Sequence, residues 1–176
     1  MYNIKLVFYG ENAEYEYGGN EELEIFHPAS DDNLKLIFLG AIYPYEAHEW
    51  YDMAKEVGFK DLNYYNEWQR HGQIENYSQI DSIGYNMGVY TKFVKFGFQR
   101  VTDMACRFVR AGLMTKEQAL QLIKDKDWMI DPTSKRDFCR TVNITEEYFD
   151  EIIDKFANKD IMVKDVNGNW RRKDLL

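Results

Sequence analysis

Residues Tyr90–Lys124, YTKFVKFGFQRVTDMACRFVRAGLMTKEQALQLIK, decide the fold class of this chain. They continue an apolar segment that spans Ile80–Val109 and is interrupted by Gly84, Gly88 and Gly97. This pattern predicts two helices or one broken helix, because glycine permits a bend or close packing. Thr115 and Gln118 have capping-box spacing ahead of ALQLI, which predicts the start of a further helix.

Helix starts recur toward the carboxyl terminus. Ser134 follows Pro132 and precedes KRDFCRTV, and Thr145 precedes two glutamates whose charge suits a helix amino terminus. We therefore expect helices to begin at Ser134 and Thr145. The last helix carries apolar residues at helical spacing, expected to form a core-facing stripe of Tyr148, Phe149, Ile152, Ile153 and Phe156. The pair Asn167-Gly168 predicts a terminal hairpin.

The amino-terminal part has a different pattern. Residues Ile4–Tyr9 are a short apolar run, which predicts a buried strand of a parallel sheet. Residues Asn33–Leu39 fit either a second short strand or a helical turn, and residues Glu46–Val57 predict a helix that ends at Gly58. The expected fold is mostly α with a short β contribution: one or two strands, a helical body and a terminal hairpin.

Composition excludes several classes of function. A formal net charge of −8 argues against nucleic-acid binding and against docking on anionic membranes, since both need clustered basic residues. With 45% hydrophobic residues the chain can bury a core. Cys106 and Cys139 form no C-x-x-C pair and are interpreted as reduced structural thiols. No signal peptide or membrane-spanning run is recognised, so a cytoplasmic protein is expected.

Two segments carry candidate binding residues. The loop after the first strand contains Glu11 and Asn12, where ligands bind in open α/β sheets, although a polar loop with glycines for turning is the alternative interpretation. Lys92, Lys95 and Arg100 could meet a diphosphate, although a solvated helix face is the alternative interpretation. The three histidines have no metal-ligand spacing, so no metal site is expected.

The order of these segments resembles the carboxyl-terminal half of the N-acetyl sugar amidotransferase family of lipopolysaccharide and nonulosonic-acid biosynthesis. The most specific matching residues are Lys95–Ala119, KFGFQR through KEQA. Further matches are LVFYGENAEYEYGG, Tyr43–Tyr45, AKEVGFK, ITEEYFDEIIDKF and WRRKDL.

The resemblance implies a PP-loop ATP-pyrophosphatase fold and an ATP- and Mg²⁺-dependent reaction. In such enzymes ATP adenylylates the acetamido oxygen of a nucleotide sugar, and ammonia from a glutaminase partner then leaves an acetamidino group. It also implies the end of an α/β nucleotide-binding domain over residues 1–40 and a helical carboxyl-terminal domain over residues 41–176. The family's Ser-Gly-Gly-x-Asp-Ser loop is not in this sequence, so we expect a carboxyl-terminal portion that neither binds ATP nor turns it over alone.

Carried over by position, the resemblance places Glu11 and Asn12 at the active site and Lys95 and Arg100 on substrate or nucleotide phosphate. Residues Gly72–Ser82, GQIENYSQIDS, match a family segment in which Asn76, Tyr77 and Asp81 fit, whereas Gln73 replaces the usual Thr. No catalytic residue is singled out. The alternative function is a non-catalytic helical module that binds a partner protein or a second copy of itself.

Overall fold

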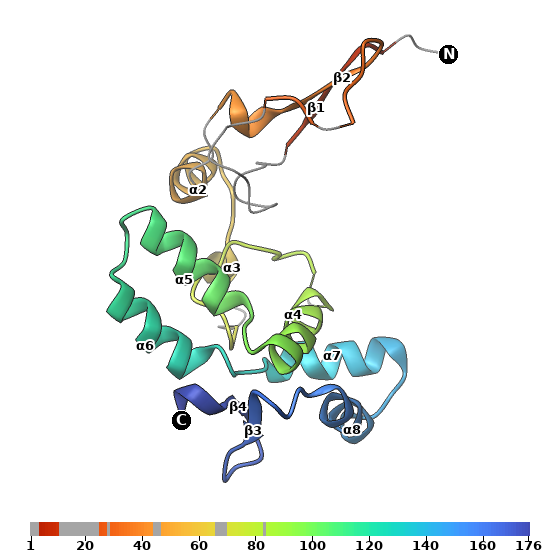
Figure 1. Cartoon of the computed structure of the whole chain (residues 1–176), viewed down its shortest axis with the longest axis vertical. Coiled ribbons are helices and arrows are strands. Elements are labelled where there is room, and N and C mark those ends of the chain that lie inside the picture. Colours follow the sequence, from red (N-terminus) through yellow and green to blue (C-terminus); the bar gives the residue numbers. More distant parts are fainter. Residues whose placement is uncertain (1–3, 11–24, 28, 44–46, 66–69, 83) are drawn as a thin grey trace. The chain divides into compact units, whose positions relative to one another are not determined.

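The computed structural model describes residues 4–10, 25–27, 29–43, 47–65, 70–82 and 84–176 of the chain. The chain divides into two compact units, Met1–Gly58 and Phe59–Leu176 (Figure 1). The domain division after residue 40 stays a prediction.

The first unit contains a small parallel sheet. Strand β1 (Leu6–Tyr9) pairs with β2 (Lys35–Phe38), with Leu6 opposite Lys35 and Tyr9 opposite Phe38. The segment after Asn33 is thus a strand, and a 3-10 turn, η1 (Leu39–Ala41), follows it. Helix α2 (Ala47–Glu56) ends before Gly58, whose φ of 101° only glycine adopts readily. The predicted helix and its glycine stop are confirmed.

The prediction of a buried first strand is wrong. Leu6 and Phe8 of β1 are exposed, whereas Leu36 and Phe38 of β2 are buried. Within the described residues β1 pairs with β2 alone, so it is an edge strand there and its apolar side chains have little to pack against.

The second unit is helical and carries a small hairpin. Its helices pack in pairs, α5 on α6 and α4 on both α7 and α8 (Figure 1). In chain order the elements are α3 (Leu62–Tyr65), α4 (Gly84–Phe96), α5 (Arg100–Arg110), α6 (Lys116–Lys126), α7 (Pro132–Val142), α8 (Glu146–Phe156), β3 (Met162–Lys164), β4 (Trp170–Arg172) and the 3-10 turn η2 (Lys173–Leu175).

The predicted break in the long apolar segment lies at Gly97. This residue has φ of 81° and separates α4 from α5. Gly84 and Gly88 do not interrupt the helix as expected but belong to α4, where a Cβ on either residue would meet no neighbouring side chain or loop atom within 4 Å. A glycine ends a helix only where the backbone turns left-handed, and only Gly97 of the three does so.

The predicted caps are correct at two positions and wrong at one. Thr115 and Gln118 form the capping box of α6, and the Thr145 side chain accepts the backbone N–H of Tyr148 at the start of α8. Helix α7 begins earlier than expected. Asp131 is its cap and Pro132 its first residue, so Ser134 lies in the first turn and is buried.

Two groups of buried side chains form the core of this unit. One joins α4, α7, α8 and the hairpin: Met87, Tyr90, Phe93, Val94, Cys139, Phe149, Ile153, Ala157, Met162 and Trp170. The other joins α5 to α6 through Val101, Ala105, Ala119 and Ile123. The predicted stripe of α8 is narrower than expected, because Phe149 and Ile153 are buried while Tyr148 and Phe156 are exposed.

The terminal hairpin is confirmed. Strand β3 pairs antiparallel with β4, and Gly168 has φ of 83° in the connecting turn. The carboxylate of Asp165 accepts the backbone N–H groups of Asn167 and Asn169, each at 2.9 Å, and so fixes this turn. The prediction of a mostly α-helical chain with a short β contribution is likewise confirmed.

Candidate functional site

The loop 70–82 is held against the helices by buried polar side chains. The guanidinium of Arg70 donates to the carbonyl oxygen of Ser78 at 2.7 Å and to that of Gln79 at 2.6 Å. Gln79 has φ of 51°, an unfavourable value for a residue with a side chain. Arg70 is buried, so its two hydrogen bonds fix this strained turn from inside.

Arg100 holds the same loop from the first turn of α5. Its Nε lies 2.8 Å from Oε1 of Glu75, and its Nη2 donates to the Ser78 hydroxyl at 2.6 Å. The Glu75 side chain is 1% exposed and that of Arg100 11%, so this ion pair is sheltered from water. Burial works to lower the pKa of Arg100, but the charge of Glu75 and the hydrogen bond to it outweigh burial and raise the pKa.

A chain of hydrogen bonds ties the loop to α4 and α7. The Gln73 side chain donates to Asn86 at 2.7 Å, and Asn86 donates to the Ser134 hydroxyl at 2.9 Å. The Asp131 carboxylate accepts the backbone N–H groups of Ser134 at 2.7 Å and His71 at 3.0 Å. Asp131 therefore both caps α7 and holds the loop in place through His71.

Gly72 brings the loop close to the segment between α6 and α7. Its φ is 72°, and a Cβ at this position would overlap the carbonyl oxygen of Met129. The same carbonyl accepts a hydrogen bond from the Gln99 side chain at 3.1 Å. The close approach requires a residue without a side chain.

These contacts define what we call the polar cluster: Arg70, Gln73, Glu75, Asn86, Arg100 and Ser134. Two buried acceptor atoms in it, Oε2 of Glu75 and Oε1 of Gln73, receive no hydrogen bond from the residues that the structure describes. A buried acceptor left without a donor costs about 1–3 kcal/mol. Each of these two oxygens is thus a buried acceptor that the described residues leave without a donor.

The polar cluster gathers charges of both signs. Burial lowers the pKa of Arg70, while the nearby carboxylates of Glu75, Asp131 and Asp81 act in the opposite direction. Arg100 adds a second cation close enough to lower the pKa of Arg70 further. The guanidinium groups of Arg70 and Arg100 thus lie near the carboxylates of Glu75, Asp131 and Asp81.

The structure brings some of the expected site residues together. Arg100 belongs to the polar cluster, and Asn76, Tyr77 and Asp81 lie on the loop that it holds. Asn76 donates to Asp61 at 3.3 Å, which connects the loop to the start of α3.

The other expected residues lie elsewhere or are not described. The Lys95 ammonium lies 4.7 Å from the ring centre of Phe156, on α8 and not on the loop. Lys92 forms an ion pair with Asp103 at 2.9 Å. Glu11 and Asn12 fall outside the described residues.

Of the six members of the polar cluster, sequence reasoning singled out Arg100 as a site residue and missed the other five. Gln73 had been noted only as a departure from the family pattern, and Glu75 stands beside Asn76 within the same matching segment. Asn86 and Ser134 are hydrogen-bonded to each other across 48 residues of sequence, so no local sequence pattern indicates this contact. Arg70 likewise acts on residues that follow it by 8 and 9 positions, a spacing without a helical or strand period.

Asp127 is a second buried carboxylate with a structural task. It accepts the backbone N–H groups of Gln99 and Thr102, each at 3.1 Å, and the Thr102 hydroxyl at 2.7 Å. It therefore caps α5 from the end of α6, in place of a local cap.

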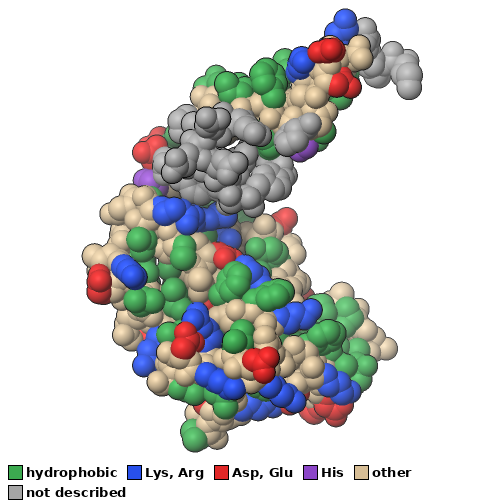
Figure 2. Space-filling model, in the orientation of Figure 1, with side chains coloured by type: hydrophobic (Ala, Val, Ile, Leu, Met, Phe, Trp, Pro, Cys, Tyr) green, Lys and Arg blue, Asp and Glu red, His purple; other side chains and the backbone are tan. Residues whose placement is uncertain are grey.

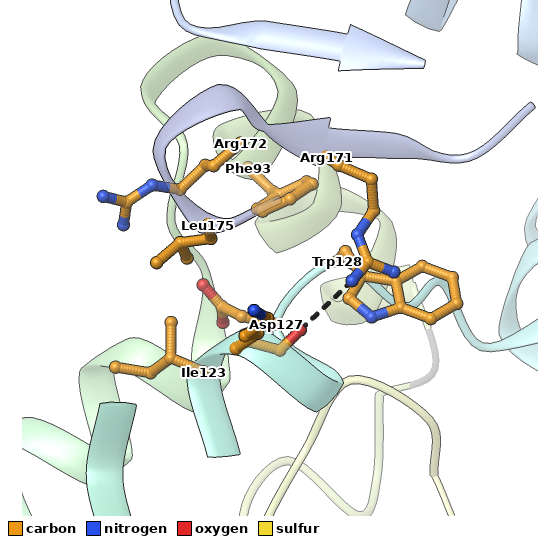
Figure 3. A pocket seen from close by; sticks show the side chains of 8 residues that line it. Phe93, Ile123, Asp127, Trp128, Arg171, Arg172 and Leu175 are labelled. Atoms are coloured by element: carbon orange, nitrogen blue, oxygen red, sulfur yellow. Dashed lines mark hydrogen bonds between the residues drawn. The ribbon is translucent and has the colours of Figure 1, made fainter. Parts of the chain in front are cut away.

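A small hollow adjoins Asp127 and is shown in Figure 3. Arg171 lies over the indole of Trp128, 4.3 Å from guanidinium carbon to ring centre, and donates to the backbone oxygen of Lys124. The hollow has a volume of about 10 Å³, room for about one water molecule. It is too small for a substrate.

The described residues also bear on metal binding and on membrane insertion. Within the described ranges, no three His, Cys, Asp or Glu side chains are grouped so that they could hold a metal ion. Across those same ranges, no helix combines the length and apolar character needed to cross a membrane.

The fold and the polar cluster together define a helical domain with a carboxyl-terminal hairpin and a buried, charge-lined loop. Residues 63–175, more than half of the chain, match the family described as "LPS biosynthesis protein WbpG-like, C-terminal domain". The chain belongs to this family, and its role is in lipopolysaccharide biosynthesis. A search of curated proteins found no match.

Proposed function

We propose that this chain is the substrate-binding, carboxyl-terminal part of an ATP-dependent N-acetyl sugar amidotransferase. The enzyme converts an acetamido group of a nucleotide sugar to an acetamidino group in the cytoplasm, and a glutaminase partner supplies the ammonia. The role of this chain is to hold the N-acetyl sugar. The PP-loop fold of the complete enzyme is part of the same proposal.

One observation carries the proposal. The polar cluster keeps two acceptor oxygens, on Glu75 and Gln73, buried and without a donor among the described residues. An N-acetyl sugar presents an amide N–H and several hydroxyl groups, which are the donors that such acceptors need. A bound sugar would remove the cost of leaving them unpaired.

The position of Glu75 also has a chemical consequence. A carboxylate that accepts the acetamido N–H increases the electron density on the amide nitrogen, and resonance passes this density to the amide oxygen, which becomes a better nucleophile. Arg100 is paired with the other oxygen of Glu75 and so holds the carboxylate in place. In this proposal Glu75 orients and activates the amide, and the buried loop excludes water from it.

Within the residues that the structure describes, no site for ATP or Mg²⁺ is identified. The Ser-Gly-Gly-x-Asp-Ser loop is not in the sequence of this chain, and among the described residues no three His, Cys, Asp or Glu side chains are grouped so that they could hold a metal ion. The two buried guanidinium groups of the polar cluster are already engaged with Glu75 and with backbone oxygens. We therefore assign no step that uses ATP to these residues.

The test is calorimetric titration of the chain with nucleotide-linked N-acetyl sugars, using Glu75→Gln. This change keeps the shape of the side chain but places an N–H₂ group where the unpaired oxygen lies. We expect affinity to fall about tenfold, the effect of losing one hydrogen bond to a charged group. Glu117→Gln, at an exposed carboxylate in the first turn of α6, is the matched control and should bind as the wild type does.

Circular dichroism spectra and melting curves of both variants show whether the fold is retained. Unchanged affinity in a folded Glu75→Gln variant would contradict the proposed role of the polar cluster. The same titration with the corresponding sugar lacking the N-acetyl group should give binding that Glu75→Gln does not alter.

A second candidate function is a helical interaction module. Several aromatic side chains of the second unit are exposed, among them Phe96 at 63% and Phe156 at 54%. Exposed apolar groups of this size are common at protein interfaces. Light scattering after size-exclusion chromatography tests for self-association, and a monomer that also captures no glutaminase subunit argues against this function.

A further inference from the structure

A hollow of about 500 Å³ lies where the turn between α4 and α5 meets the carboxyl-terminal end of the chain. Phe96, Phe98 and Ile161 form its apolar part. Its charged wall consists of Asp160, Arg172, Lys173 and Asp174. This volume is within the range of small-molecule sites, and none of these residues belongs to the polar cluster.

The apolar side offers an aromatic surface. Phe96 is 63% exposed, and its ring centre lies 6.5 Å from that of Phe98. The Lys92 ammonium lies 4.2 Å from the Phe98 ring centre, whereas Phe96 has no cation over its ring within the described residues. Phe96 is therefore the ring available for stacking by a ligand.

Gly97 fixes the charged wall against this surface. With φ of 81° it bends the chain, and a Cβ there would lie 3.3 Å from Cγ and Cδ of Arg172 and 3.4 Å from Ile161. The missing side chain lets the Arg172 stem pack on the turn. Arg172 then donates two hydrogen bonds to the carboxylate of Asp174, at 3.0 and 2.5 Å, which hold its guanidinium in one orientation.

Lys173 supplies a second cation. Its ammonium donates to the backbone oxygen of Lys159 at 2.7 Å, which positions the group without cancelling its charge. It forms no ion pair with the residues that the structure describes. Lys and Arg side chains intermingle with hydrophobic ones over the visible face of this unit (Figure 2).

The charge balance restricts the ligand. The wall carries two cations and two carboxylates, so a bare anion meets repulsion as well as attraction. A ligand with phosphate oxygens for Arg172 and Lys173, and with hydroxyl or N–H donors for Asp160 and Asp174, satisfies both signs. A flat ring on the same ligand would stack on Phe96.

We propose that this hollow binds a nucleoside diphosphate, with the base against Phe96 and the phosphates against Arg172 and Lys173. The identification of this group with the nucleotide end of the sugar substrate rests on the function proposed above. The turn 96–100 then serves both ends of the substrate, because Phe96 lies in the hollow and Arg100 in the polar cluster.

The experiment is titration of the complete 176-residue chain with uridine, thymidine and guanosine diphosphates and with inorganic pyrophosphate. Phe96→Ala should weaken the tightest nucleotide by about tenfold, the effect of losing one stacked base. Phe156→Ala is the control, because it removes a ring of similar exposure that lies outside the hollow. It should change the affinity for the nucleotide less than twofold, which is about the error of the measurement. Lys173→Ala should weaken binding about threefold, as one exposed charge contact does.

Failure to bind any of the three nucleotides overturns the proposal. So does equal weakening by Phe96→Ala and Phe156→Ala, or pyrophosphate binding as tight as that of the nucleotide. Both phenylalanines are exposed, so alanine at either position should leave the fold intact, and melting curves check this directly.

The two proposals fail separately. If Glu75→Gln weakens the N-acetyl sugar nucleotide while Phe96→Ala does not, the hollow is wrongly assigned and the proposed function stands. If nucleotide binding depends on Phe96 but the sugar adds no affinity and Glu75→Gln changes nothing, the hollow stands and the proposed function is wrong.

Discussion

The carboxylate of Asp127 stabilises a helix to which it does not belong. It accepts two backbone N–H groups and one hydroxyl at the start of α5, although it lies at the end of α6. Asp127→Asn turns one acceptor atom into a donor that faces other donors. We expect the free energy of unfolding to fall by about 1–3 kcal/mol. Urea denaturation followed by circular dichroism measures this, with the exposed Asp125→Asn as a control that should change stability by less than about 0.5 kcal/mol.

Burial of the same carboxylate predicts the sign of one pH-dependent contribution to the stability of the protein. Burial raises the pKa of Asp127 above its ordinary value of 3.8, against the hydrogen bonds from Thr102 and Gln99. A raised pKa in the folded state means that folding favours the protonated form. This contribution is fully present below pH 3.8 and is lost as the pH rises through the folded-state value.

Comparison with Asp127→Asn isolates this effect from those of other acids. The stability of the wild type relative to the variant should increase as the pH is lowered from 7 toward 3.8. Paired urea titrations at several pH values give this difference. A difference that stays constant, or that shrinks in acid, would contradict the raised pKa.

Among the elements, α6 depends on a cap that the sequence already indicates. Thr115 and Gln118 exchange hydrogen bonds of 2.9 and 3.2 Å at its first turn. Thr115→Ala removes the side-chain acceptor and should lower stability by about 1 kcal/mol. Thr141→Ala, at an exposed position within α7, is a matched control that should be neutral or slightly stabilising, because alanine favours helix interiors. If the two variants have the same melting temperature, the Thr115 cap does not contribute to stability.

Elements whose signals are local were predictable. The caps at Thr115 and Thr145, the break at Gly97 and the hairpin at Asn167-Gly168 each follow from residues within one turn of each other. The cap of α5 was not predictable, because Asp127 comes from 25 and 28 residues away. Neither helical nor strand periodicity indicates a contact between residues that lie 25 or more positions apart in the sequence.

The polar cluster likewise contains features that the sequence predicted and features that only the structure revealed. Arg100 and the segment containing Asn76 were found through a family pattern, whereas the pairing of Arg100 with Glu75 spans 25 residues and needed the structure. Burial was also misjudged where it depends on neighbours that the local pattern does not contain. Leu6 and Phe8 have the composition of a buried strand, but the described part of their unit supplies a single neighbouring strand.

For the whole molecule, the distribution of buried side chains makes a prediction about folding. Both hydrophobic groups of the second unit consist of residues between Met87 and Trp170, and the polar cluster also lies within residues 59–176. A unit that holds its own core should fold without the rest of the chain. We therefore expect residues 59–176, expressed alone, to unfold in a single cooperative transition by circular dichroism.

Phe93→Ala in that fragment provides the necessary contrast. Phe93 is 2% exposed and belongs to the larger core group, so truncating it should cost about 3–5 kcal/mol and lower the transition midpoint steeply. Phe96→Ala, three residues further on α4 but exposed, should leave the midpoint close to that of the unchanged fragment. A fragment that melts gradually, or one in which the two variants behave alike, would mean that the core of this unit requires residues 1–58. The family match begins at residue 63, so independent folding would also make the matched region a domain in the physical sense and not only in sequence.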